Sequence, residues 1–410
     1  MQAGFERVYA EIDLNRVRQN LVSVSKNMTA GLSGRKQEFV CVVKADAYGH
    51  GAAAIARFIE EEVAEDGVRA HGETVPVWGF AVATAEEGIE LRLAGICKPV
   101  LLLGFVPASR YAEMIEYGIR IPLFEAERIR AFDQAAESLG KKGLFHVAVD
   151  TGMSRIGLTP DERGLETVRE ALACPHVEAE GIFTHLATAD MPDNAGSFVQ
   201  IERFRSFVKL LQENGIDIPF KHYANSAATV YGMYRNDSDL CRLGISLYGL
   251  PASEAIAAET PEVKPVMSLY SQVMYVKDVP AGTPVGYGAL FVTDRPSRIA
   301  TVSVGYADGY PRGLSNKADV LIRGVRCPVV GRVCMDIIMV DVTKLGLGSR
   351  NPVREEDRVT LIGRDGDEEI TVCELASLAD RFYYELPCLI TKRVPRVYIR
   401  KIEEQDSKKS

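Results

Sequence analysis

Residues 39–44 read FVCVVK, residues 77–82 read VWGFAV, and a helix-like segment, 51–64 (GAAAIARFIEEEVA), lies between them. Both strand-like runs are apolar almost throughout, as expected for strands of a parallel sheet that is covered on both faces. An apolar strand, a helix and a second apolar strand form the βαβ unit, which places two parallel strands in one sheet. This stretch therefore predicts an α/β fold.

The same alternation continues through the first 250 residues. The further strand candidates are 99–103, 120–123, 144–149, 179–184, 220–223 and 242–247, and the further helix candidates are 84–95, 125–139, 160–172 and 197–213. Eight strand–helix units in about 250 residues are typical of a closed (β/α)8 barrel. We therefore predict an N-terminal TIM-type barrel.

The sequence changes character after Leu250. Residues 251–262 (PASEAIAAETPE) look like a linker, and the segments that follow are strand-like and separated by Gly and Pro. The candidates are strands at 268–276, 298–305, 319–323, 328–333, 337–342, 358–363 and 394–400, and one short helix at 373–382. We predict a barrel domain at 1–255 and a mostly antiparallel β domain at 256–410.

Composition narrows the class of partner and the compartment. The 410 residues include 48 Lys and Arg against 56 Asp and Glu, a net charge of −8 that argues against nucleic acid or an anionic membrane as partner. No run of 18 apolar residues occurs, and the N-terminal segment has no apolar stretch typical of a secretory signal. The eight cysteines are scattered without a CxxC pair. We expect reduced thiols, no metal site and a cytoplasmic location.

Polar residues interrupt the ends of several predicted barrel strands, where barrel enzymes place their chemistry. Lys44 follows two valines, Arg155 lies in a loop bounded by glycines, His185 follows Thr184, and Arg242 belongs to the last predicted strand. A desolvated lysine can form a Schiff base with a carbonyl cofactor, although a lysine there can also extend to water. Arg155 suits a carboxylate or phosphate but also an ordinary loop, and a single histidine is often a core residue.

Phosphate-binding and tyrosine-bearing motifs come later in the chain. Ser226, Gly244 and Ile245 follow the seventh and eighth strands, where barrels commonly bind phosphate. In the β domain, Tyr287 lies in PVGYG and Tyr306 opens YADGYPR. A tyrosine flanked by glycines has an accessible ring, and the alternative explanation for these glycines is hairpin geometry.

These segments together resemble the alanine racemase family of barrel-type pyridoxal-phosphate enzymes. The resemblance extends from AEIDLN near the N-terminus to RVPR near the C-terminus. Its most specific parts are VKADAYGHG at 43–51, DTGMSRIG at 150–157, GYADGYPR at 305–312 and VGRVCMD at 330–336.

The resemblance implies a role for each matching residue. Lys44 is expected to carry pyridoxal 5'-phosphate as a Schiff base and to act as one acid/base, and Tyr287 of a second chain in a homodimer is expected to act as the other. The remaining expectations are cofactor binding by Tyr48, His185, Ser226, Arg242, Gly244 and Ile245, and substrate binding by Arg155, Met335 and Tyr306. Racemisation needs two such groups because the α-proton leaves one face of the substrate and returns to the other.

The implied function is interconversion of L- and D-alanine, which supplies D-alanine for peptidoglycan. Two departures from the family pattern leave the substrate open. Ala148 stands where the family usually has a lysine that orients the arginine, so a chloride, a water network or another carboxylate is expected beside Arg155. Lys392 stands where the family usually has a tyrosine, and relatives that act on serine or several amino acids also vary there.

Three other functions compete with this one. A serine racemase or a racemase of broad specificity has the same motifs. A barrel-type decarboxylase shares the lysine but has no need of a second base such as Tyr287. A pyridoxal-phosphate carrier that consists of a barrel alone leaves the β domain unexplained.

Overall fold

The structure is a computed structural model that describes residues 7–28, 31–64, 74–232, 237–253, 255, 261–346 and 351–400. It divides into two compact units. The barrel unit comprises Arg16–Ala47 and Gly51–Lys264, and the β unit comprises Met1–Asn15, Tyr48–His50 and Pro265–Ser410. Among the described residues, no helix has the length and hydrophobicity that crossing a membrane requires.

Eight parallel strands form the wall of the barrel unit, in the order β8-β7-β6-β5-β4-β3-β2-β9. The strands are β2 (Glu38–Val42), β3 (Val77–Val82), β4 (Val100–Leu102), β5 (Ile119–Leu123), β6 (Gly143–Ala148), β7 (Val177–Phe183), β8 (Phe220–His222) and β9 (Leu240–Leu243). Backbone bonds from Asp239 to Lys221 and from Arg242 to Ala224 connect the two end strands. This arrangement confirms the predicted TIM-type barrel.

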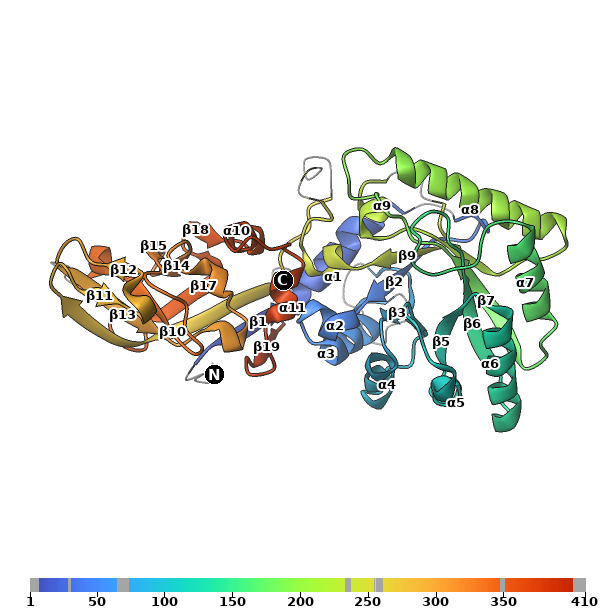
Figure 1. Cartoon of the computed structure of the whole chain (residues 1–410), viewed down its shortest axis with the longest axis horizontal. Coiled ribbons are helices and arrows are strands. Elements are labelled where there is room, and N and C mark those ends of the chain that lie inside the picture. The colour runs from blue at the N-terminus through green and yellow to red at the C-terminus, as the bar shows by residue number, and fades with distance from the viewer. Residues whose placement is uncertain are drawn as a thin grey trace, which may run out of the picture. The chain divides into compact units, whose positions relative to one another are not determined.

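Helices follow most of these strands and cover the outer face of the barrel (Figure 1). They are α3 (Ala52–Phe58), α4 (Ala85–Leu93), α5 (Tyr111–Glu116), α6 (Ala126–Leu139), α7 (Glu162–Leu172), α8 (Ala195–Glu213) and the short α9 (Ser226–Val230), while α1 (Leu14–Ser25) precedes β2. Polar side chains cap the N-termini of two of these helices. Thr84 and Glu87 form a capping box at α4, and Asp161 caps α7.

The last barrel strand ends earlier than the sequence predicts. The prediction placed a strand at 242–247, whereas β9 ends at Leu243 and a short 3-10 helix, η3 (Ile245–Tyr248), follows. Gly244 causes the change, because its backbone angles (φ −105°, ψ −102°) are not those of a strand. The chain turns there, so Gly244 and Ile245 lie at the end of the strand.

The β unit contains a nine-stranded sheet. Its strands are β1 (Tyr9–Asp13), β10 (Met267–Val279), β13 (Ser297–Val302), β14 (Asp319–Ile322), β15 (Val325–Pro328), β16 (Ile338–Asp341), β17 (Arg358–Asp365), β18 (Glu368–Ile370) and β19 (Arg396–Ile399). Its pairs are antiparallel except β1 with β19, and a separate hairpin joins β11 (Pro284–Val285) to β12 (Phe291–Val292). The mostly antiparallel β domain is therefore confirmed.

Three details of the β unit differ from the sequence prediction. The strand predicted at 328–333 occurs earlier, as β15, and α10 (Val372–Leu378) and α11 (Glu385–Leu389) replace one helix at 373–382. The strand β1 was not predicted, and it pairs with β10 and β19. The boundaries 1–255 and 256–410 stay a prediction.

Candidate functional site

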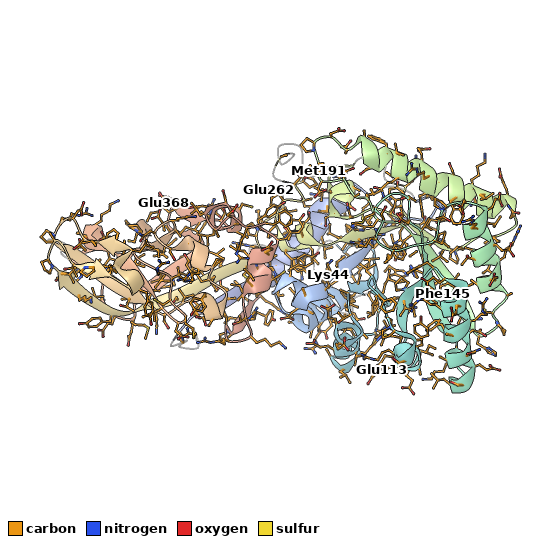
Figure 2. The ribbon with its side chains drawn as sticks, in the orientation of Figure 1. Lys44, Glu113, Phe145, Met191, Glu262 and Glu368 are labelled. Carbon is orange, nitrogen blue, oxygen red and sulfur yellow. The ribbon has the colours of Figure 1, made fainter. Side chains whose placement is uncertain are left out.

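Lys44 lies directly beyond β2, where it begins the short helix α2 (Lys44–Tyr48), and Figure 2 labels it there. The four residues after it have left-handed backbone angles, with φ between 52° and 55°. Such angles cost non-glycine residues roughly 1–2 kcal/mol each, and strain of this kind is concentrated at functional sites. The half-buried lysine is therefore set at the strand end by an unusual, strained turn.

Two carboxylates hold this left-handed turn. Glu87 accepts hydrogen bonds from the backbone N–H of Ala45 and of Ala83, both at 2.7 Å. Asp46 accepts from the backbone N–H of Ala52 at 2.8 Å, which ties the turn to the start of α3. Hydrogen bonds to carboxylates are about twice as strong as neutral ones. Glu87 thereby connects the residue after Lys44 to the end of the neighbouring strand β3.

Arg242, on β9, is buried in the barrel, and both of its terminal guanidinium nitrogens have hydrogen-bond partners. It donates to the backbone carbonyls of Thr184 at 2.8 Å and Tyr223 at 3.1 Å. It also faces Nδ1 of His222 at 2.8 Å and Nδ1 of His185 at 3.3 Å. Burial lowers the pKa of Arg242 to about 10, so the group stays cationic at neutral pH.

His185 lies beside Arg242 and lines one cavity with Arg155. Burial and then the charges of Arg242, Arg155 and Lys44 lower the pKa of His185 to about 3, so its ring is neutral. Because a guanidinium can only donate, Nδ1 of His185 must accept and Nε2 must carry the proton. The His185 ring therefore has one N–H, on Nε2, that can donate a hydrogen bond close to positively charged side chains.

Ser226 and Gly244 are joined at the ends of β8 and β9. The Ser226 hydroxyl accepts from the backbone N–H of Gly244 at 2.7 Å, which leaves its own proton free to donate. Asn225 caps α9 by accepting from the N–H of Ala228 at 3.0 Å. Ile245 begins η3 directly after Gly244. The Ser226 hydroxyl, which can donate a hydrogen bond, therefore lies at the N-terminus of α9 and next to Gly244, which precedes η3.

Arg155 lies in a loop that Asp150 organises. The Asp150 carboxylate accepts from the backbone N–H groups of Gly152, Met153 and Ser154 at 2.9, 3.0 and 3.0 Å. It is therefore occupied by backbone donors. No acidic partner of Arg155 occurs in the part of the chain that the structure describes.

The short side chain of Ala148 helps to line a small cavity beside Arg155. The cavity has a volume of about 20 Å³, enough for one water or small ion, and Thr184 and His185 also line it. The structure therefore places a small void where the family usually has a lysine.

Tyr48 is assigned to the β unit together with Gly49 and His50. Burial raises the pKa of the Tyr48 phenol, so this group is neutral and can donate a hydrogen bond. Gly49 has φ +79°, and a Cβ on it would lie 2.0 Å from the carbonyl oxygen of Pro387. Only glycine fits this place, which explains why Gly49 follows Tyr48 in this turn.

Tyr287 follows β11, on a short helical turn between two glycines that both have φ +71°. Its side chain is 73% exposed. Gly286 has φ +71°, a backbone conformation that residues with a Cβ rarely adopt, so another residue there would be strained. The turn orients Tyr287 through backbone geometry and leaves the ring uncovered within the unit.

Tyr306 and Met335 are tied together by the backbone. The N–H of Tyr306 donates to the carbonyl of Cys334 at 3.0 Å, and that of Ala307 donates to Met335 at 3.0 Å. Asp308 holds this turn by accepting from the N–H of Gly305 at 2.9 Å. A cavity of about 480 Å³ is lined by Tyr287, Tyr306, Arg312, Arg332 and Met335, among others.

The structure thus gathers the predicted residues into two groups. Within the barrel unit, Lys44, Arg155, His185 and Arg242 act on one another electrostatically, and Ser226 bonds Gly244. Within the β unit, Tyr287, Tyr306 and Met335 share one cavity.

Sequence reasoning missed Glu87, His222, Arg312 and Arg332. A signal existed for Glu87, because TAEE at 84–87 is a capping-box pattern. Arg312 and Arg332 lie inside motifs that had been noted for their tyrosine and methionine. His222 gave no signal, since a lone histidine in an apolar segment is usually structural.

Comparison with known proteins identifies the family. The family model described as alanine racemase, N-terminal domain, matches residues 12–252, and the one described as alanine racemase, C-terminal domain, matches residues 266–398. The chain is 39% identical to the alanine racemase of Methanococcus maripaludis over 392 residues, which cover 96% of this chain and 98% of that protein.

Solved structures agree. The alanine racemase of Clostridium difficile 630 superimposes with a TM-score of 0.86 at 34% identity and covers 97% of both chains. The histidine racemase of Leuconostoc mesenteroides has a TM-score of 0.84 at 28% identity, covering 97% of this chain and 99% of its own. The sequence motifs, the barrel with its β unit and these similarities lead to one conclusion: the chain belongs to the alanine racemase family of isomerases.

Proposed function

We propose that the enzyme interconverts L- and D-alanine by a two-base mechanism that uses pyridoxal 5'-phosphate. The observation that carries the proposal is the placement of Lys44 at the end of β2 in the same barrel as Arg242, which faces His185 at 3.3 Å, and Arg155, which lines one cavity with His185. Cationic side chains in one barrel suit an anionic cofactor and a substrate carboxylate. The Lys44 amine suits the aldehyde of that cofactor.

Residues of the barrel unit, together with Tyr48, would hold the cofactor. The hydroxyls of Ser226 and Tyr48 and the backbone N–H of Ile245 would donate to its phosphate, and Gly244, whose N–H holds the Ser226 hydroxyl, would lie against it. Arg242 would face the ring nitrogen, and because a guanidinium only donates, that nitrogen would stay unprotonated. Pyridoxal phosphate, when bound, makes the α-hydrogen of an attached amino acid acidic.

Two groups would move the α-proton. The Lys44 amine would take or return it on one face of the substrate, and Tyr287 of the partner subunit would do so on the other. Arg155 would receive the substrate carboxylate together with the backbone at Met335 of the partner subunit, and Tyr306 of the partner subunit would line the entrance. This assignment requires a homodimer, and the exposure of Tyr287 supports it.

We further propose that the enzyme is cytoplasmic and supplies D-alanine to peptidoglycan. The eight cysteines, scattered along the sequence without a CxxC pair, support a reducing compartment. Partners other than the amino acid and the second subunit are not required by this function.

A second candidate is a racemase for serine or for several amino acids. It is favoured by Lys392, which stands in place of the usual tyrosine and is exposed in the β unit. The similarity to a histidine racemase also shows that this architecture accepts a larger side chain in a relative.

Exchange of the α-hydrogen for deuterium, measured on a panel of L-amino acids, separates these candidates. We expect L-alanine to exchange fastest and to yield D-alanine, with L-serine slower and L-histidine slowest. Faster exchange of serine or histidine would replace the alanine assignment, and absence of exchange from every substrate would contradict the racemase function. Lys392→Tyr is the matched variant: an unchanged substrate profile removes Lys392 from the determinants of specificity.

A further inference from the structure

A continuous row of polar side chains crosses the barrel interior on five successive strands. Arg242 on β9 faces Nδ1 of His222 on β8 at 2.8 Å, and Nε2 of His222 faces Nδ1 of His146 on β6 at 2.8 Å. Nε2 of His146 faces Glu180 on β7 at 3.4 Å, and Glu180 pairs with Arg120 on β5 at 2.9 Å. Both histidines are completely buried.

The arginine at one end fixes where every proton in this row lies. A guanidinium has no acceptor, so Nδ1 of His222 must accept and Nε2 must carry the proton. That proton can only go to Nδ1 of His146, so the His146 proton is on Nε2 and points to the Glu180 carboxylate. An imidazolium at His146 would require both nitrogens of His222 to lack protons. Each hydrogen bond in the row from Arg242 to Glu180 is therefore donated in the same direction, from Arg242 to His222, from His222 to His146 and from His146 to Glu180. Both imidazole rings are neutral.

The electrostatics of the row agree with this deduction. Burial lowers the pKa of His146, and burial together with the charge of Arg242 lowers that of His222 well below its usual value. Burial by itself would raise the pKa of Glu180, but hydrogen bonds from His146 and Arg120 lower it to about 2. The carboxylate is therefore charged and able to accept throughout the neutral range.

The surrounding residues are shaped to hold the two rings. A Cβ on Gly181 would lie 2.5 Å from Nδ1 of His146, so glycine is needed for the ring to lie against β7. The ring of Phe183 stacks on His222 with centroids 5.1 Å apart, and Trp78 contacts His146 at 5.7 Å. With both rings enclosed, a donor left without an acceptor would cost about 1–3 kcal/mol, which disfavours the reverse tautomers.

We propose that His222, His146 and Glu180 are positioning residues that fix the orientation of the Arg242 guanidinium by imposing a single tautomer along the row. This inference rests on the proposed function only in the role of Arg242 toward the cofactor. If Glu180 loses its charge, His146 can carry its proton on either nitrogen. The reversed row would then place an N–H of His222 against an N–H of Arg242, and the guanidinium would move away.

The tautomers can be read directly by ¹⁵N NMR of the full-length holoenzyme and apoenzyme labelled at histidine. The six histidines make the spectrum tractable, and His146→Asn and His222→Asn variants assign its signals. We expect His146 and His222 to be neutral and protonated on Nε2 at pH 7 in both forms. A proton on Nδ1 of either ring, or an imidazolium, would overturn the proposal. Since no substrate is present, a wrong substrate or reaction assignment leaves this result unchanged.

Glu180→Gln tests the role of the row. Its amide can accept from or donate to His146, so we expect mixed tautomers at His146 and His222 and a kcat about tenfold lower, with KM nearly unchanged. Glu178→Gln is the matched control, because Glu178 lies on the same strand with an exposed side chain. Mixed tautomers with unchanged kcat would show that the row does not position Arg242. A lower melting temperature without a change of tautomer would indicate a purely structural role and would equally overturn the proposal.

Discussion

The two groups of candidate site residues differ in what holds them in place. In the barrel unit, Arg242 is 3% exposed and Ser226 8%, and buried hydrogen bonds fix both. In the β unit, Tyr287 is 73% exposed and Met335 52%, and backbone turns set their positions. The barrel group is organised by its own interior, while the β group presents side chains that the described residues of its unit leave largely exposed. This difference supports the proposal that a second subunit completes the site.

Replacement of Lys44 by alanine should have the largest effect, because it removes both the proposed cofactor attachment and one acid/base. We expect racemisation to fall by roughly 10⁴-fold or more, beyond the usual contribution of one acid/base group. Borohydride reduction followed by mass spectrometry should show cofactor attached in the wild type and none in the variant. A cofactor adduct that persists in the variant would refute Lys44 as its site. Lys36→Ala, a change outside the barrel strands, serves as the control.

Tyr287→Phe tests the exposed group of candidate site residues, which lies in the β unit. We expect a 10²–10⁴-fold loss of racemisation, since one of two acid/base groups is removed. Exchange of the α-hydrogen should be slowed much more from one enantiomer than from the other. The melting temperature should hardly change, because the ring is mostly exposed and its hydroxyl supports no buried network. Equal exchange from both enantiomers at the wild-type rate would contradict the two-base assignment.

Acid should destabilise the barrel unit through its buried imidazoles. The pKa values of His146, His185 and His222 are all lowered in the folded state, His185 to about 3. Below about pH 6.5 the unfolded chain therefore binds protons that the folded chain does not, and stability falls as the pH falls. Each imidazole contributes about 1.4 kcal/mol per pH unit in this window.

Urea unfolding of the apoprotein at pH 7.5, 6.0 and 5.0 measures this slope. His222→Asn should reduce this slope, because it removes one of the buried rings. A stability that is constant between pH 7.5 and 5.0 would show that the buried rings are protonated in the folded protein.

The parts of the fold that the sequence predicts are those with local signals. Most of the barrel strands are recognisable because they are largely apolar runs followed by a helix. Lys44 is recognisable because a charge directly after such a run needs an explanation. The strand β1 is not, since YAEID acquires its partners β10 and β19 from more than 250 residues away.

The candidate site residues show the same limit, because contacts between residues far apart in the sequence leave no local pattern. Glu87 contacts Ala45 across 42 positions, and His222 meets His146 across 76, so neither pair has a local pattern. The backbone angles beside Tyr287 are suggested by its flanking glycines, which is why the sequence singles out this tyrosine as a candidate. Residues that act through a single side chain at a strand end are predictable, and residues that hold others in place are not.

Glu87→Gln tests how much the Glu87 carboxylate contributes to the position of Lys44 in the barrel unit. The amide keeps an acceptor for the N–H of Ala45 but loses the charge and one of the two acceptor oxygens. We expect a loss of about 1–2 kcal/mol in the free energy of unfolding and a kcat several-fold lower, because the strained turn after Lys44 is less well held. Glu86→Gln is the control, since Glu86 is exposed and pairs with Arg110 on the surface. Losses of stability and kcat equal to those of Glu86→Gln would mean that the turn after Lys44 does not depend on the Glu87 carboxylate.

The smallest effect should come from Ala148→Leu, which fills the cavity beside Arg155. Whatever occupies that space, a water or a small anion, would be displaced, and Arg155 would lose a polar neighbour without losing its own charge. We expect KM for alanine to rise about two- to fivefold, since the loss of one hydrogen bond costs roughly 0.5–1 kcal/mol, while kcat is nearly unchanged. Repeating the assay with chloride replaced by gluconate distinguishes the occupants. If chloride fills the cavity, its removal should raise KM in the wild type and not in Ala148→Leu, whereas a water would make both enzymes indifferent to chloride. A wild-type KM equal to that of Ala148→Leu in every buffer would mean that Arg155 needs no partner at this position.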